Sequence, residues 1–177
     1  MNKLKTSNNF NVTTHKLLTK FYFNSILNKT ITFLEKKNLT VLDFGCGNSY
    51  LKKKLKNNNQ IKVVGYDIIE NLSEVKNWKT LKFDYFIAIH VFMYLSYEEL
   101  IELIDYLKTN KPKIKLIAVI SKENFINRIG AFLLNEKEAH KNTRISPKYQ
   151  IQILKEKMRI IKKDNIFFLS DIYLLSF

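Results

Sequence analysis

The sequence predicts an α/β fold, in which a mostly parallel β-sheet has helices on both of its faces. Two segments, 85–89 and 116–120, are almost continuously apolar, as expected of strands that are covered on both sides. A glycine-containing turn at 45–47 directly follows a short apolar strand, and extended and helical patterns alternate from there on. A chain of 177 residues, 46% of them hydrophobic, is long enough for one such domain with a sizeable core.

The first element lies before the sheet. Apolar positions in residues 14–37 follow mostly helical spacing, so we expect one or two helices there. The pattern then changes to alternating strands and helices without a linker or an internal repeat. We therefore expect an N-terminal helical lead-in at 1–38 and a single α/β domain at 39–177.

The remaining elements follow from the apolar pattern and from end signals. Ser96 and the pair Ser146-Pro147 are good helix starts, because Ser caps the first N–H groups and Pro suits the first helical position. Strands are expected at 40–44, 61–67, 84–91 and 113–121. Helices are expected at 49–58, 96–110 and 146–158, with a helix and loop at 124–142. The end of the chain predicts two strands around a turn near Ser170-Asp171.

Charge and composition restrict the classes of function. The net charge of +14 suggests a nucleic-acid partner, but only three of the 30 basic residues are Arg, the preferred residue for bidentate phosphate contacts. The densest basic cluster, at 51–56, has the spacing of the solvated face of a helix. Nucleic acid therefore remains an open but less favoured partner.

The cysteine count and the length of the apolar runs bear on the cellular compartment. Cys46 is the single cysteine, which excludes an internal disulfide and fits a reducing cytoplasm. No apolar run approaches the length that crosses a bilayer, and the first residues lack the apolar core of a signal peptide. We expect a cytoplasmic protein without a membrane span, and nothing in the sequence indicates its oligomeric state.

The glycine turn predicts a nucleoside ligand. Glycines after a strand let the backbone approach a ligand closely, and Asp67 closes the second strand 20 residues after Gly47, where an acid can accept hydrogen bonds from a ribose diol. Asp43 distinguishes between ligands of this kind. A carboxylate at the strand end repels a pyrophosphate but attracts an ammonium or a sulfonium, and S-adenosylmethionine carries both of these cations and a ribose.

At these residues the sequence resembles the class I S-adenosylmethionine-dependent methyltransferases. "VLDFGCGNSYL" is similar to the first motif of that family, "VVGYDI" to its second-strand motif, and "FDYFIAIHVFMYLSYEEL" to its fourth-strand segment. The resemblance covers roughly residues 39–121. It implies a Rossmann-like, three-layer α/β/α fold, a mostly parallel sheet with an antiparallel C-terminal strand, and S-adenosylmethionine as cofactor.

The resemblance also implies roles for the first motif. The backbone of Gly45, Cys46 and Gly47 is expected to line the methionine portion of the cofactor. Asp43 is expected near its amino group.

The nucleoside is expected to contact the second motif and the segment after it. The resemblance implies that Asp67 binds the ribose hydroxyls and that Ile68 packs against adenine. The family usually has a full helix and strand before its fourth strand, whereas only residues 68–83 are present here. We therefore expect this region to be reduced, with Asn77 or Trp78 reaching the base.

The acceptor is the less determined half of the reaction. The fourth-strand segment lacks the proline motif of base-directed enzymes, which favours a small-molecule, sugar, glycan or lipid-precursor acceptor, with a hydroxyl as its nucleophile. His90 and His140 are the candidate catalytic bases, and no metal ligands are expected. Two alternatives stay open: an RNA methyltransferase or RNA-binding protein that uses the lysines, and a non-catalytic relative of the family.

Overall fold

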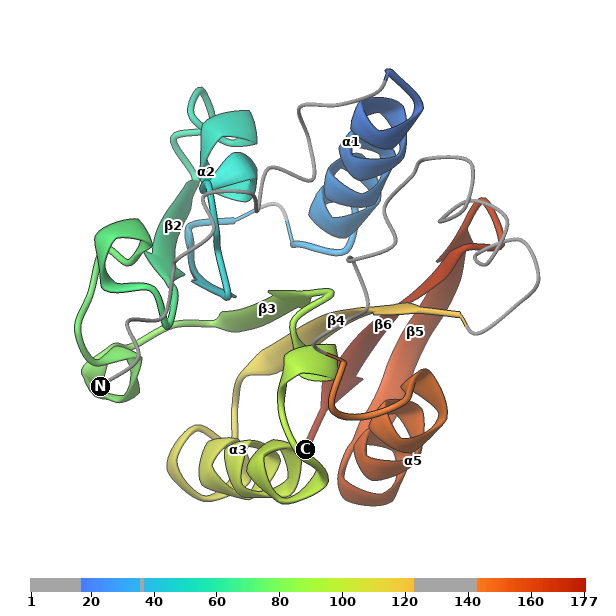
Figure 1. Ribbon diagram of the computed structural model, residues 1–177. Coiled ribbons are helices and arrows are strands. Elements are labelled where there is room, and N and C mark those ends of the chain that lie inside the picture. The colour runs from blue at the N-terminus through green and yellow to red at the C-terminus, as the bar shows by residue number, and fades with distance from the viewer. Residues whose placement is uncertain (1–16, 36, 123–142) are drawn as a thin grey trace, which may run out of the picture.

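A six-stranded sheet forms the centre of the computed structural model, which describes residues 17–35, 37–122 and 143–177. The strand order is β2-β1-β3-β4-β6-β5 (Figure 1). The strands are β1 (Leu39–Phe44), β2 (Ile61–Tyr66), β3 (Tyr85–Ile89), β4 (Lys115–Ser121), β5 (Arg159–Ile166) and β6 (Ser170–Ser176). The helices are α1 (Leu17–Ile31), α2 (Tyr50–Lys54), α3 (Tyr97–Asn110) and α5 (Pro147–Lys157).

Strand directions confirm the predicted fold class. β2, β1, β3 and β4 are parallel to one another, while β6 runs antiparallel to both of its neighbours, β4 and β5. Since parallel strands need crossover connections, the helices lie on the faces of the sheet. The sheet is therefore mostly parallel with an antiparallel C-terminal end, as the resemblance implied.

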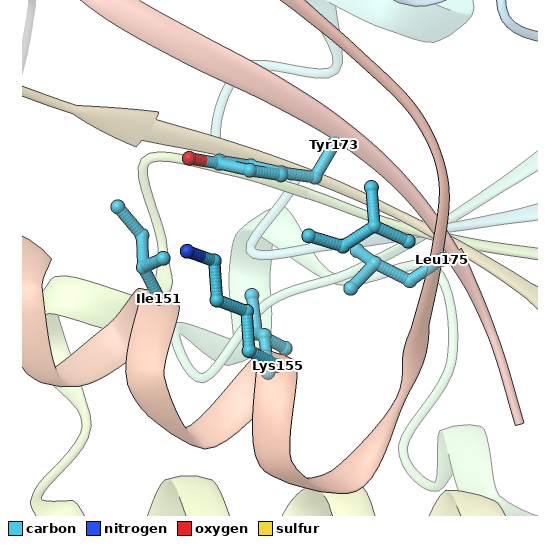
Figure 2. A pocket seen from close by; sticks show the side chains of 6 residues that line it. Ile151, Lys155, Tyr173 and Leu175 are labelled. Carbon is cyan, nitrogen blue, oxygen red and sulfur yellow. The ribbon is translucent and has the colours of Figure 1, made fainter.

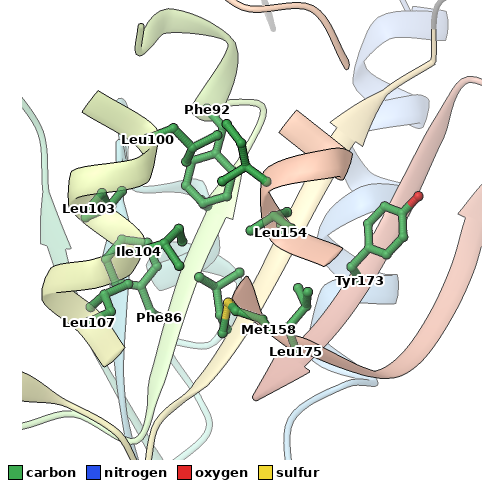
Figure 3. Packing of buried hydrophobic residues seen from close by; sticks show 14 of the residues in the cluster. Phe86, Phe92, Leu100, Leu103, Ile104, Leu107, Leu154, Met158, Tyr173 and Leu175 are labelled. Carbon is green, nitrogen blue, oxygen red and sulfur yellow. The ribbon is translucent and has the colours of Figure 1, made fainter. Parts of the chain in front are cut away.

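Helices cover both faces and make three layers. α1 and α2 lie on one face, which we call the α1 face, and α3 and α5 lie on the other, the α3 face (Figure 1). The two faces have separate apolar clusters, because successive residues of a strand point to opposite sides. On the α3 face, side chains of the two helices, such as Ile104 and Leu154, pack against strand side chains such as Phe86 of β3 (Figure 3).

Helix starts follow the sequence signals to different degrees. At α3 the Ser96 hydroxyl accepts a hydrogen bond from Glu99 N, and the Glu99 carboxylate accepts one from Ser96 N, so a full capping box is present. At α5 the Ser146 side chain makes no capping bond, although Pro147 occupies the first turn. α2 has only five residues and is shorter than expected.

The region 68–83 is reduced, as predicted. It contains two short 3-10 helices, Glu70–Leu72 and Trp78–Thr80, and no strand, all of its residues being described. The segment passes along β2, where Glu74 N donates to Gly65 O at 3.0 Å. It thereby covers part of the edge strand, whose N–H and C=O groups would otherwise be open to another chain.

The end of the chain differs from the prediction by a few residues. The turn between β5 and β6 lies at 167–169, and Ser170 and Asp171 already belong to β6. Both residues are buried and have polar partners there, Tyr22 for the serine and two lysines for the aspartate, so their polarity does not mark a turn. The helix and loop expected at 124–142 lie outside the described residues.

Candidate active site

The carboxyl ends of β1 and β2 bring the two sequence motifs together. The strands pair in parallel, with Asp43 opposite Gly65 and Phe44 opposite Tyr66, so the glycine turn and Asp67 leave the sheet side by side. Gly47 N donates to Asp67 Oδ2 at 2.9 Å. The predicted ribose acid is therefore in direct contact with the predicted glycine turn.

The N–H groups of the glycine turn are already used within the protein. Gly45 N and Cys46 N both donate to Tyr66 O, at 2.7 and 3.0 Å, and Gly47 N donates to Asp67. A phosphate-binding turn directs such groups at its anion. Here the turn has carboxylate and carbonyl oxygens to offer instead, which suit a ligand that donates hydrogen bonds or carries positive charge.

Asp67 joins two segments of the chain. Its Oδ1 accepts a hydrogen bond from Ile69 N at 3.0 Å, while Oδ2 accepts the one from Gly47. The Asp67 N–H in turn donates to Ser73 Oγ at 3.2 Å. An ionised carboxylate has about four acceptor positions, so these two bonds leave room for a diol.

The two glycine positions of the turn favour glycine for different physical reasons. Both have a positive φ, +73° for Gly45 and +47° for Gly47. A Cβ at Gly45 would lie 2.4 Å from a methyl carbon of Val91, so this glycine permits close packing against the segment after β3. A Cβ at Gly47 would meet nothing within 4 Å, so the space in front of this glycine is open.

Asp43 is a buried carboxylate with a strongly shifted pKa. Burial, together with the charges of Asp67 and Glu74, raises the pKa of Asp43 to about 7. In the part of the chain that the structure describes, no basic side chain pairs with it. The neighbouring Cys46 thiol is also buried, and burial and the Asp43 charge raise its pKa to about 11, which keeps it protonated.

This set of hydrogen-bond acceptors fits S-adenosylmethionine. The cofactor would present an ammonium, a sulfonium and ribose hydroxyls, and the site presents carboxylates, carbonyl oxygens and open space at Gly47. The carboxylates do not form a metal site: among the described residues, no group of three His, Cys, Asp or Glu side chains is arranged to hold an ion.

The expected adenine contacts divide into exposed and buried side chains. Ile68 is 91% exposed, directly after Asp67. Asn77 is exposed, and its side chain accepts a hydrogen bond from Lys79 N. Trp78 is only 6% exposed and packs edge-on against Phe44 in the core of the α3 face, so it has little surface to offer a base.

His90 lies directly after β3, next to the end of β4. Its backbone has a φ of +56°, and its N–H donates to Val119 O at 3.0 Å. The Nδ1 atom lies 3.1 Å from Ser121 Oγ, and the ring contacts Tyr22 and Phe23 of α1. The second candidate base, His140, lies outside the described residues.

Some residues at the site were not singled out from the sequence. Glu74 forms an ion pair with Lys52 at 2.6 Å and adds negative charge near Asp43. Tyr22 and Ser170 form a hydrogen bond beside His90. Glu74 belongs to the irregular segment and Tyr22 to the helix before the sheet, so neither carries a local sequence signal for this position.

A small hollow lies elsewhere in the molecule, between α5 and the last two strands. It is too narrow to hold a water molecule, and its walls include Ile151, Tyr173 and Leu175 (Figure 2). Lys155 also lines it, with a side chain that extends from α5 towards the Tyr173 ring (Figure 2). Its size and its apolar walls do not suit a nucleoside.

The order and directions of the strands define the class of protein, that of the class I methyltransferases. A family model described as a methyltransferase domain matches residues 19–129, which is more than half of the chain. The chain therefore belongs to this methyltransferase family, and the prediction of a class I S-adenosylmethionine-dependent methyltransferase is confirmed. No curated protein matches the sequence.

Solved structures show the same fold at low sequence identity. The PH0226 protein from Pyrococcus horikoshii OT3 matches with a TM-score of 0.66 and 16% identity over 94% of each chain. The magnesium protoporphyrin IX methyltransferase from Synechocystis PCC 6803, solved with SAH, matches with a TM-score of 0.63 and 17% identity over 92% of this chain and 88% of that chain. A SAM-dependent methyltransferase from Aquifex aeolicus matches with a TM-score of 0.61 and 18% identity, over 84% of this chain and 88% of that chain.

The helices of the described residues do not reach membrane-spanning length. None combines enough residues with enough apolar character to cross a bilayer.

Proposed function

We propose that this protein transfers a methyl group from S-adenosylmethionine to a hydroxyl of a small-molecule, glycan or lipid-precursor acceptor. The observation that carries the cofactor half is the hydrogen bonding of the glycine turn. Its N–H groups donate to Tyr66 and Asp67, so the ligand faces oxygen acceptors and the buried Asp43. One solved neighbour is named as a magnesium protoporphyrin IX methyltransferase, which supports a small-molecule acceptor.

The residues of this chain have separate tasks in that reaction. Asp43 would hold the ammonium, Asp67 the ribose hydroxyls and Ile68 one face of adenine, with the backbone of the glycine turn against the methionine portion. When bound, the cofactor supplies a methyl group carried on a sulfonium sulfur. Once the methyl group is transferred, that sulfur leaves as a neutral thioether. His90 would accept the proton that the acceptor hydroxyl loses, and the apolar side chains around it would exclude water.

Calorimetry with S-adenosylmethionine and its demethylated product tests the cofactor half. We expect saturable heat with both ligands, because both have the ribose and the ammonium. Asp67→Ala should abolish binding, while Asp67→Asn, which retains an oxygen acceptor for the backbone N–H groups, should weaken it. Asp105→Ala, which removes an acid of α3 that pairs with Lys157, is the matched control and should bind like the wild type.

Two outcomes would contradict the proposal. One is the absence of heat from the wild type at millimolar ligand, which favours a non-catalytic relative. The other is unchanged binding by Asp67→Ala, which places the nucleoside elsewhere. Transfer of labelled methyl groups to hydroxyl-bearing acceptors then tests the second half, with His90→Asn as the inactive variant.

A further inference from the structure

Four polar side chains gather on the α1 face where β4 ends. They form two hydrogen-bonded pairs: His90 Nδ1 with Ser121 Oγ at 3.1 Å, and the Tyr22 hydroxyl with Ser170 Oγ at 2.5 Å. Ser121 and Ser170 are direct partners in the β4–β6 ladder. Since side chains of paired residues in an antiparallel ladder lie side by side on one face, the two pairs are neighbours.

The surroundings of these pairs are apolar. Phe23, Ile89, Val119 and Ile172 belong to the hydrophobic cluster of the same face or pack against it. Polar groups in such a layer cost stability unless they are hydrogen-bonded to one another, and apolar side chains of similar size would fill the space without that requirement. The polar set is therefore better explained by what it does to His90 than by packing.

His90 is also held in an unusual backbone conformation. Its φ of +56° lies in the left-handed region, which few residues other than glycine adopt. Such conformations persist where surrounding contacts over-determine them, and they are concentrated at functional sites. The imidazole lies near two rings of α1, with its centroid 6.4 Å from that of Tyr22 and 6.3 Å from that of Phe23.

We propose that Ser121 selects the Nδ1–H tautomer of His90, and that Tyr22, anchored by Ser170, fixes the plane of the imidazole. This rests on the proposed function, in which His90 is the base. An Nδ1–H that donates to Ser121 Oγ leaves the lone pair on Nε2, and Nε2 can then take a proton from the acceptor hydroxyl. When it takes that proton, the imidazole becomes a cation with both nitrogens protonated. Ser121, Tyr22 and Ser170 are thus positioning residues.

The state of Tyr22 is compatible with an anchoring role. Burial raises the pKa of its phenol, and the hydrogen bond to Ser170 opposes this in part. The phenol therefore keeps its proton at neutral pH and does not compete with His90 as a base. Its hydroxyl reaches across from α1 to β6, so it links the helix before the sheet to the antiparallel end of the sheet.

Nitrogen chemical shifts of the histidine rings test the proposal without any acceptor. His90 is identified by the signals that disappear in His90→Asn, a substitution chosen because Asn tolerates a positive φ. At a pH where the ring is neutral, we expect Nε2 of the wild type at the shift of a non-protonated nitrogen. Ser121→Ala should move it to the shift of a protonated nitrogen, and Ser121→Thr should restore the wild-type position.

Further variants separate positioning from packing. Tyr22→Phe retains the ring but loses the bond to Ser170, and we expect broadened or averaged shifts for His90. Ser176→Ala, a serine at the other end of β6, is the matched control and should change nothing. A protonated Nε2 in the wild type, or unchanged shifts in Ser121→Ala, would overturn the inference.

Failure of this inference is distinguishable from failure of the proposed function. Cofactor binding by calorimetry depends on Asp43 and Asp67, and the bonds of the two polar pairs include neither aspartate. A wild type that binds the cofactor but has the Nε2–H tautomer contradicts only the positioning role. Loss of folding in Ser121→Ala would be seen in its thermal melt, and the wild-type tautomer and Ser121→Thr would still decide the question.

Discussion

Among single residues, Asp43 gives the ligand-free protein a specific dependence on pH. Its pKa is raised to about 7 by burial and by neighbouring carboxylates, against an ordinary value of 3.8. Between these two values the folded state binds more protons than the unfolded state. The contribution of protonated Asp43 to the free energy of unfolding is therefore largest below pH 3.8. It is lost as the pH rises to about 7.

Asp43→Asn should stabilise the ligand-free protein at pH 8 and abolish cofactor binding. Removing the buried charge should raise the free energy of unfolding by up to roughly 4 kcal/mol, since one pKa unit corresponds to about 1.4 kcal/mol. The gain should shrink as the pH falls and disappear below 3.8, where the carboxyl becomes protonated in both states. Thermal melts of both proteins across this pH range check the prediction, and a variant less stable than the wild type at pH 8 would contradict it.

The two glycines of the turn should respond differently to alanine. Gly45→Ala places a methyl group against Val91 at a positive φ, and we expect a loss of about 3 kcal/mol or more. Gly47→Ala has only the strain of its φ, about 1–2 kcal/mol, but its methyl group enters the space expected for the cofactor.

Denaturation and calorimetry together separate these effects. The double variant Gly45→Ala/Val91→Ala should recover part of the stability that Gly45→Ala loses, because the close contact between the added methyl group and Val91 is removed. Gly47→Ala should remain folded and lose binding. A stable Gly45→Ala, or a Gly47→Ala that binds normally, would show that these spaces are not as described.

Among the helices, the start of α3 can be tested against the start of α5. Ser96→Ala removes a hydroxyl that accepts a bond from Glu99 N, and should cost about 1 kcal/mol. Ser146→Ala is the matched control, because the Ser146 side chain makes no capping bond, and should cost clearly less. Chemical denaturation of both variants measures this difference, and equal losses would contradict the capping role.

Elements with strong local signals were predictable from the sequence. The apolar strands, the Ser96 helix start and the reduced segment at 68–83 all follow from nearby residues. Other features depend on how distant segments pack. Trp78 was expected at the base but belongs to an aromatic core, and Tyr22 reaches Ser170 only because α1 lies over the end of the sheet. No local pattern specifies such contacts.

Over the molecule as a whole, the two lysine clusters of the described residues lie on opposite faces of the sheet. The cluster at 51–56 lies with α2 on the α1 face, while residues 108–111 close α3 on the opposite face (Figure 1). Several of these lysines also have partners in the fold. Lys52 pairs with Glu74, and Lys111 Nζ donates to Leu81 O at 2.7 Å.

We therefore expect only weak, non-specific RNA binding. The dissociation constant for a short single-stranded RNA should be in the range of roughly 10⁻⁴ to 10⁻⁶ M at physiological salt. Fluorescence anisotropy at about 50 and 200 mM salt measures both the affinity and its salt dependence. Tight binding with a steep salt dependence would instead support an RNA-directed methyltransferase.

The double hydrogen bond of Asp67 has a consequence for the interpretation of related sequences. Because this carboxylate ties the glycine turn to Ile69, selection for folding alone would preserve it in a descendant that no longer binds the cofactor. Among the described residues, the Asp43 carboxylate forms no such hydrogen bond, and its buried charge destabilises the empty site, so we expect a descendant without the cofactor to lose it. We therefore expect the acid at position 43 to be the better marker of retained activity among relatives.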